Sequence, residues 1–161
     1  MTVLEYLEAS RLSQWLSISM AGGPTLLALH SVGMAVVVGL SLMIALRLHG
    51  VLPGPGIERL PGLLKVTAWG FALNVLTGLG FFITRGPEYI SSAIFLMKMA
   101  LVAVSAALTA WLWRRLAPRA RTTAGPPIDG VARTLSFAAT LTWFGAVVAG
   151  RLIAYLSDLY R

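Results

Sequence analysis

Three ionisable side chains lie within otherwise apolar stretches of this sequence: His30, Lys98 and Arg151. Ionisable residues inside membrane-spanning segments are costly to bury and commonly mark a functional site. The same stretches contain no Asp or Glu, which gives little support to a carboxylate proton relay or a sodium site. A group of His, Lys and Arg without an acid favours an anionic or electron-rich guest, such as haem propionates, a quinone carbonyl or lipid phosphates.

His30 has more than one chemical role open to it. It could be a neutral imidazole bonded to a nearby hydroxyl or carbonyl group, or an axial ligand of haem iron. His49 follows 19 residues later, about 28 Å along the same helix, so the two cannot share one haem. The sixth ligand would be His30 of a second protomer or a methionine such as Met20, Met97 or Met99.

Copper is an alternative guest for His30. Met34 stands one helical turn away on the same face, and Met97 and Met99 flank Lys98. Thioether together with imidazole suits Cu(I). Methionine is also common packing material in apolar cores, and the adjacent lysine disfavours a cation site.

Asn74 and Tyr155 complete the predicted site. Asn74 lies with Thr77 slightly deeper than the ionisable residues, and Tyr155 follows Arg151 by one turn. Lys98 and Arg151 could instead extend their long stems to the membrane surface. The predicted cofactor-binding residues are His30, Lys98, Arg151, Asn74 and Tyr155, with His30 as the candidate metal ligand and no catalytic residue.

The composition identifies the elements that position these residues as membrane helices. Of the 161 residues 57% are hydrophobic and 12% charged, with a mean hydropathy of +0.79, whereas soluble domains carry about a quarter charged residues. Four stretches, 23–46, 64–84, 92–113 and 135–156, meet the roughly 20 apolar residues that a span requires. The sequence predicts one all-α domain over 1–161, an integral membrane four-helix bundle, with His30, Lys98 and Arg151 at similar depth near one face.

Residues 2–20 differ from the spans. Thr2 and Glu5 have the spacing of a capping box, and Leu12 and Trp15 share an apolar face opposite polar residues. This pattern predicts an amphipathic helix in the membrane interface, with Trp15 as an anchor. The acidic start and the absence of an apolar core before Ala21 argue against a signal peptide.

The basic residues predict the orientation. Eight of them lie in or beside the two loops that follow the first and third spans: Arg47, Arg59, Lys65, Arg114, Arg115, Arg119, Arg121 and Arg133. The positive-inside rule places these loops in the cytoplasm. Both termini are then outside, periplasmic for a bacterial inner membrane. The net charge of +7 is largely explained by these loops, so no nucleic-acid partner is expected.

Small residues recur at one-turn spacing, as in Ala35–Gly39, Gly70–Asn74–Gly78 and Gly145–Ala149. Such patterns let helices approach closely, which predicts a compact bundle, a homo-oligomer, or a subunit of a membrane complex. Trp143, near the middle of the fourth span, is expected to need a partner for its indole N–H. Residues 118–130, rich in Arg, Thr, Gly and Pro, resemble a mobile linker.

Several stretches together resemble a family of bacterial four-helix membrane proteins related to the copper-resistance D type. They are Leu29-His30-Ser31-Val32-Gly33, Leu46-Arg47-Leu48-His49-Gly50, Gly70-Phe71, Thr77-Gly78, Tyr89, Phe95, Lys98 and Gly150-Arg151-Leu152-Ile153-Ala154-Tyr155. The resemblance covers all four spans, although Ser92 stands where the family carries Asn. It implies a four-helix bundle with His30, Lys98 and Arg151 at characteristic positions and no established activity.

These observations lead to one main functional hypothesis and two alternatives. The main one is a small electron-transfer module that binds haem b or a quinone. The alternatives are a non-catalytic accessory or scaffold subunit of a membrane complex, and a copper-binding membrane protein. Independent catalysis is not expected, since the sequence has no serine–histidine–acid set, no glycine-rich phosphate loop and no paired carboxylates at working depth. The absence of cysteine excludes disulfides, thiolate metal sites and covalent c-type haem attachment.

Overall fold

The described chain is built from helices alone. The computed structural model describes residues 3–53, 56–118 and 129–159, except the side chains of 57 and 156–159. The elements in these ranges are α1 (Val3–Glu8), α2 (Arg11–Ile18), α3 (Gly22–Leu48), the 3-10 helix η1 (Ile57–Arg59), α4 (Leu60–Ser91), α5 (Ala93–Leu116) and α6 (Gly130–Leu159). Four of these helices, α3, α4, α5 and α6, are long and apolar enough to cross a membrane. The prediction of an all-α chain with four long apolar helices is confirmed.

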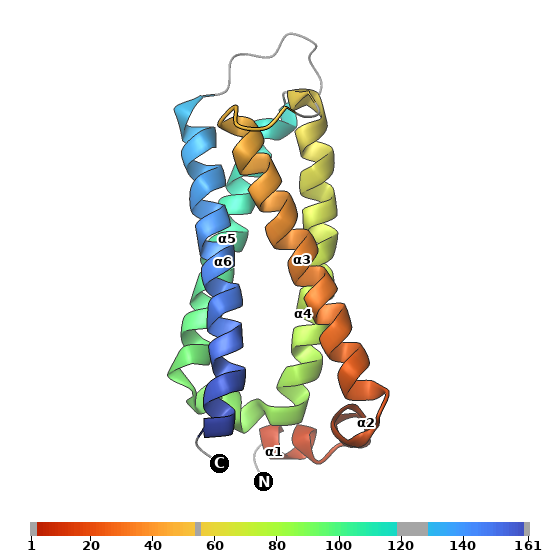
Figure 1. The fold of residues 1–161 in the computed structure, drawn as a ribbon. Helices are drawn as coiled ribbons and strands as arrows, with labels where there is room; N and C mark the ends of the chain where they lie inside the picture. The colour runs from red at the N-terminus through yellow and green to blue at the C-terminus, as the bar shows by residue number, and fades with distance from the viewer. Residues whose placement is uncertain (1–2, 54–55, 119–128, 160–161) are drawn as a thin grey trace.

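The four long helices run side by side as an elongated bundle (Figure 1). One end, here called the loop end, carries η1 and the residues that flank the α5–α6 connection. The other, called the terminal end, carries α1, α2 and the α4–α5 junction. Helix α3 packs on α4 and on α6, whereas α5 packs mainly on α6. The bundle is therefore two helix pairs, α3 with α4 and α5 with α6, that join through α3 and α6.

The packing of the bundle differs between its two ends. Its hydrophobic core lies at the loop end and is made of Ile44, Leu48, Leu60, Leu64, Leu112, Leu116, Ala132 and Leu135. In the terminal half, defined as residues 22–34, 74–91, 93–104 and 144–155, the described residues that are buried are Gly22, Gly33, Thr77, Gly86, Ala146 and Ala149. No described side chain buried there is larger than threonine, so the interior of that half lacks large apolar filling.

Helix α4 is longer than the predicted span and changes direction near its end. The backbone at Arg85 leaves the helical region (φ −149°, ψ 38°), and Pro87 follows within the same element. A proline has no N–H to donate and disfavours helical geometry at the residue before it. The predicted end at Thr84 coincides with this break, after which one more helical stretch leads to Ser91.

The N-terminal segment forms two short helices where the sequence predicted one. Chain direction changes at Ser10, whose hydroxyl accepts a hydrogen bond from Ser13 N at 3.2 Å and so caps α2. Ser13 is buried, whereas Leu12 and Trp15 are more than half exposed. Ser13 is thus the inward residue of α2, whereas Leu12 and Trp15 face outward. Thr2 of the predicted capping box lies outside the described residues.

The loop end closes with an ion pair between the last two helices. Arg115 Nη1 of α5 lies 2.7 Å from Asp129 Oδ2, and Asp129 Oδ1 accepts a hydrogen bond from Ala132 N at 2.9 Å. Asp129 therefore caps the start of α6 and ties it to the end of α5. Most of the predicted linker, residues 119–128, lies outside the described residues.

Candidate functional site

His30 of α3 is held by Thr77 of α4. The imidazole Nδ1 lies 2.7 Å from Thr77 Oγ1, in a contact that joins the two helices across the bundle interior. The edge of the imidazole also meets the ring of Phe81, one turn further along α4, with centroids 5.5 Å apart. Two residues of α4 thus fix the orientation of His30.

The hydrogen bonds of Thr77 determine which ring nitrogen of His30 carries the proton. Thr77 Oγ1 donates its one proton to Leu73 O at 2.7 Å, so it acts as acceptor toward His30. Nδ1 of His30 is therefore the donor, and in the neutral imidazole Nε2 keeps a lone pair. His30 presents to the bundle interior a nitrogen that can accept a proton or a metal ion.

The space beside the His30 ring is lined by small residues. A Cβ built on Gly78 would lie 3.8 Å from His30 Cε1 and would meet no other described atom within 4 Å. On the other side, Asn74 packs over Gly33, and its Oδ1 is buried without a hydrogen-bond partner among the described residues. The histidine thus borders open space at Gly78 and close-packed backbone at Gly33.

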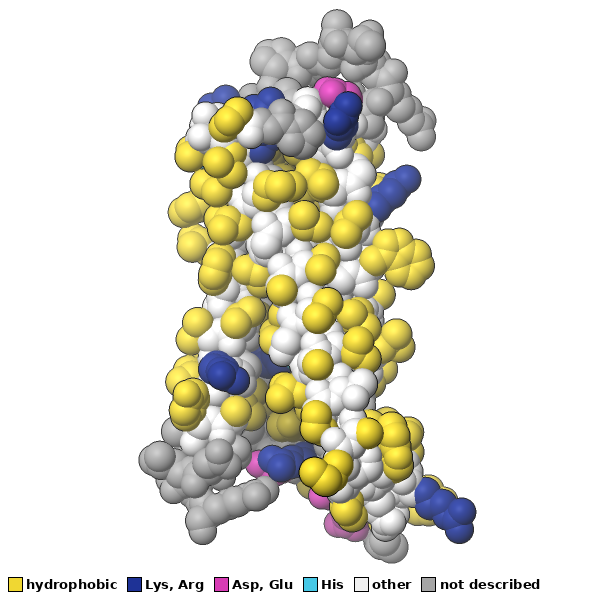
Figure 2. Space-filling model, turned by 45° about the vertical axis from the view of Figure 1, so that its right-hand side comes forward, with side chains coloured by type: hydrophobic (Ala, Val, Ile, Leu, Met, Phe, Trp, Pro, Cys, Tyr) yellow, Lys and Arg dark blue, Asp and Glu magenta, His cyan; other side chains and the backbone are white. Residues whose placement is uncertain are grey.

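Lys98 reaches the same interior from the other helix pair. Its Cε and Nζ each lie 3.4 Å from the position of a Cβ built on Gly150, so the lysine stem crosses α6 where α6 has no side chain. Lys98 and His30 lie within electrostatic range of one another. Figure 2 shows a hollow between α3 and α6 in the terminal half, with a basic side chain recessed in it. His30 and Lys98 therefore lie in the same part of the terminal half, where no large described side chain is buried.

The remaining predicted site residues lie apart from this pair. Arg151 is exposed on α6, directly after Gly150, and Tyr155 is 66% exposed one turn later. Met97 and Met99, which flank Lys98, are about half exposed at 48% and 47%. The structure thus brings together His30, Asn74 and Lys98 and leaves Arg151, Tyr155 and both methionines toward the outside of the helices.

The proton position on His30 can be measured directly. Nitrogen-15 NMR of the imidazole is expected to show the tautomer protonated at Nδ1, because Thr77 Oγ1 accepts from that atom. Thr77→Val removes the acceptor and is expected to abolish this preference, while Thr77→Ser keeps it. A tautomer protonated at Nε2 in the unmodified chain would contradict the assignment.

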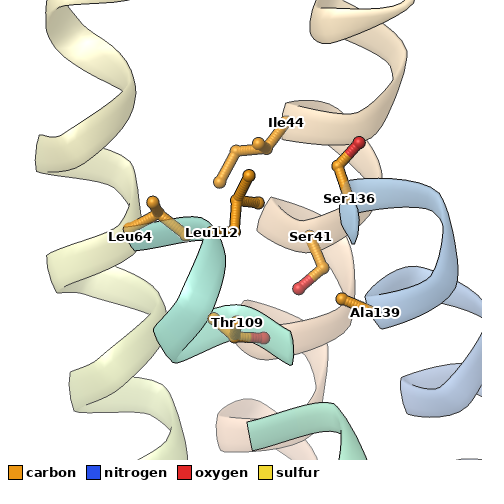
Figure 3. Close-up of a pocket in the computed structure, with 7 residues that line it drawn as sticks. All are labelled: Ser41, Ile44, Leu64, Thr109, Leu112, Ser136 and Ala139. Carbon is orange, nitrogen blue, oxygen red and sulfur yellow. The ribbon is translucent and has the colours of Figure 1, made fainter. Parts of the chain in front are cut away.

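A small cavity lies in the loop half, and its lining includes three hydroxyl residues, Ser41, Thr109 and Ser136 (Figure 3). Its volume of about 10 Å³ is close to the least that one water molecule needs. Trp143 Nε1 donates to Thr109 Oγ1 at 3.3 Å, which confirms that the indole has a hydrogen-bond partner. The size of this cavity excludes an organic guest, so the hollow beside His30 and Lys98 is the candidate site.

No family model, curated protein or solved structure matches this chain. The resemblance to the copper-resistance D type therefore stays a prediction made from the residues quoted above. The case for a function depends on the geometry of His30, Thr77 and Lys98.

Sequence reasoning did not include Thr77, Phe81, Gly78 or Gly150 among the site residues. The first three share one face of α4 with Asn74, since they follow it by three, seven and four residues. This spacing could have identified the face of α4 but not its partner. Gly150 carried no such signal, because its role depends on Lys98 lying across it.

Proposed function

We propose that this chain is a small membrane module that binds a quinone or quinol ring between its two helix pairs, as part of an electron-transfer system. The proposal is carried by the His30–Thr77 hydrogen bond, which leaves the Nε2 lone pair available to a guest. The second support is Lys98, a basic residue with no acidic residue near it along the four spans. No Asp or Glu lies in residues 22–48, 60–84, 93–116 or 130–155, so Lys98 has no carboxylate from these segments.

The two side chains suit the two redox forms of such a ring. His30 Nε2 accepts a hydrogen bond from a quinol hydroxyl, and the Lys98 ammonium donates to a quinone oxygen. The ring itself would carry the electrons. This chain would bind and orient it, exclude water, and take a hydroxyl proton at Nε2.

Haem b and copper fit the described residues less well. Nε2 of His30 is a suitable axial ligand, with Thr77 orienting the ring from the other nitrogen as metal-bound histidines require. Most of the other candidate donors lie elsewhere: His49 is at the loop end, Met20 is 95% exposed, and Met97 and Met99 are about half exposed. This leaves Met34, one turn after His30 on α3, as the soft donor beside His30 along that helix. One chain thus offers one nitrogen and one thioether from adjacent turns of α3, which cannot occupy the two opposite axial positions of a haem and are few for a copper site.

The test is to identify the small molecule that co-purifies with the protein and to measure which one the stripped protein binds. Solvent extraction of protein isolated in mild detergent is expected to yield a quinone, and stripped protein is expected to bind added quinol saturably at one ring per chain. A Soret band in the isolated protein would overturn the proposal in favour of haem held between protomers. Stoichiometric copper without quinone would overturn it in favour of metal binding. Protein that carries and binds none of these guests would overturn it in favour of an accessory subunit.

We further propose that the chain lies in a bacterial inner membrane with its loop end in the cytoplasm. The basic residues near that end support this orientation through the positive-inside rule. The exposed Tyr6 of α1 and Trp15 of α2 support an interfacial position of these two helices at the outer surface. Small residues on the helix faces support contact with a second copy or with other subunits.

A further inference from the structure

The hollow that contains Lys98 opens to the side of the bundle, between α3 and α6. In the terminal half α3 packs onto α4, where Leu26 meets Gly80 and Asn74 meets Gly33, and α6 packs onto α5 through Gly145. The large buried side chains of α3 and α6 begin only at Val37 and at Trp143 and continue toward the loop end. On the terminal side of these residues the described parts of α3 and α6 share no large buried side chain, whereas α4 and α5 meet through Phe82, Tyr89 and Phe95. Figure 2 shows the gap between α3 and α6 as a hollow on the molecular surface.

The end of the bundle beneath this hollow is partly covered by α1 and α2. Leu4 of α1 contacts α4 at Gly86, where an added Cβ would lie 3.3 Å from Leu4 Cδ2. Helix α2 packs against the start of α3, so that a Cβ on Gly22 would lie 2.7 Å from Trp15 O. Both short helices lie across the terminal end (Figure 1). Access from water along the bundle axis is thus narrowed, while the side between α3 and α6 is open.

The exposed side chains that α3 and α6 carry in the terminal half, here called the rim, are mostly apolar. Leu27 and Val32 on α3 are 54% and 55% exposed, and Val148 and Leu152 on α6 are 57% and 42% exposed. Arg151 lies among the α6 residues and is exposed as well. In a membrane these side chains contact lipid. A guest that crosses this rim must itself be soluble in lipid, with its polar group directed at Lys98.

We infer that the site takes its ligand sideways from the membrane, through the opening between α3 and α6, and that the ligand is a long-tailed quinone whose tail stays in the lipid. This inference rests on the proposed function for the ring, but the opening itself can be tested without any ligand. Long apolar tails lose little free energy at such a rim because they exchange one apolar environment for another.

The experiment is nitroxide scanning in lipid vesicles, and it is simplified by the absence of cysteine from the chain. Single labels are placed at Gly78→Cys, beside the His30 ring, and at Met34→Cys, one turn after His30 on α3. Collision with oxygen is then compared with collision with a water-soluble nickel complex. Gly39→Cys is the matched lipid control, because a Cβ at Gly39 meets nothing within 4 Å. Val51→Cys, at a residue that is 64% exposed in the loop after α3, is the water control.

The labels at Gly78 and Met34 are expected to behave like the one at Gly39, with high oxygen collision and low nickel collision. Nickel collision at Gly78 and Met34 as high as at Val51 would overturn the inference in favour of entry from water. Low collision with both reagents would overturn it in favour of a closed interior. Two labelled positions guard against misfolding of one variant.

A second measurement tests the identity of the ligand separately from the existence of the opening. Addition of a long-tailed quinone to the vesicles is expected to lower oxygen collision at Gly78 severalfold while leaving Gly39 unchanged. A short-tailed, water-soluble quinone is expected to act more weakly. If the hollow is open to lipid but no quinone changes collision at Gly78, the opening stands and the quinone function is overturned.

Discussion

Replacement of His30 by phenylalanine is expected to weaken quinol binding by roughly tenfold to a hundredfold, the range that corresponds to losing about 1.4 to 2.8 kcal/mol of interaction. Phenylalanine keeps a ring beside Phe81, which contacts His30 edge-on, but removes the Nε2 lone pair. Thr77 still donates to Leu73 O in the variant, so folding is expected to change little. Equilibrium titration of stripped protein with quinol measures the effect.

His49→Phe is the matched control for this prediction. It makes the same substitution in the same helix, but His49 caps α3 at the loop end, where its Nδ1 donates to Ala45 O at 2.8 Å. The affinity of the His49→Phe variant for quinol is expected to equal that of the unmodified chain. Equal weakening in both variants would show that loss of a histidine acts through general stability, and an unaffected His30→Phe variant would remove His30 from the site.

Gly33→Ala is expected to lower the free energy of unfolding by about 1 to 3 kcal/mol, the usual cost of overfilling a packed interior. A Cβ at Gly33 would lie 2.7 Å from Asn74 Oδ1 and 2.9 Å from Gly70 O. The second of these atoms belongs to the backbone, so the strain can be relieved only if α3 and α4 move apart. Reversible unfolding in mixed micelles, followed by loss of helical circular dichroism, measures the change.

Gly39→Ala, two turns away in the same helix, is the control. No atom lies within 4 Å of a Cβ at Gly39, so this substitution is expected to be neutral or to stabilise by up to about 1 kcal/mol through helix propensity. The pair also tests the site, because separation of α3 from α4 lengthens the His30–Thr77 contact. If both variants unfold alike, the close approach at Gly33 does not hold the two helices together.

The positions of the four long helices could be predicted from sequence because they depend on hydropathy alone. Long apolar stretches must form helices in lipid. Three of the four predicted spans each fall within one observed helix, and the fourth, 92–113, starts at Ser92, the N-cap one residue before α5. The ends were less predictable. Helix α4 continues past Thr84, and the amphipathic pattern of residues 2–20 did not reveal the break at Ser10, where the chain turns to begin α2.

The pairing within the candidate site could not be read from the sequence. His30, Lys98 and Arg151 were expected at one depth, but depth does not determine which way each side chain points. His30 meets Thr77 because the approach of Gly33 to Gly70 fixes the register of α3 against α4. Arg151 is exposed because α6 turns its neighbour Gly150 toward Lys98. Rotations and registers of this kind depend on contacts between helices.

The concentration of large buried side chains at the loop end has a mechanical consequence. Because Ile44, Leu48, Leu112 and Leu116 interlock there, α3 and α6 are held together at the loop end, whereas at the terminal end the two helix pairs meet through α4 and α5, where Phe95 stacks on Phe82 and Tyr89. A small movement of α3 relative to α6 in the terminal half changes the width of the hollow without separating the large side chains of the loop end. The free energy needed for such a motion is therefore low compared with that of separating the loop end. The loop half of the bundle can thus stay fixed while the distance between α3 and α6 in the terminal half changes.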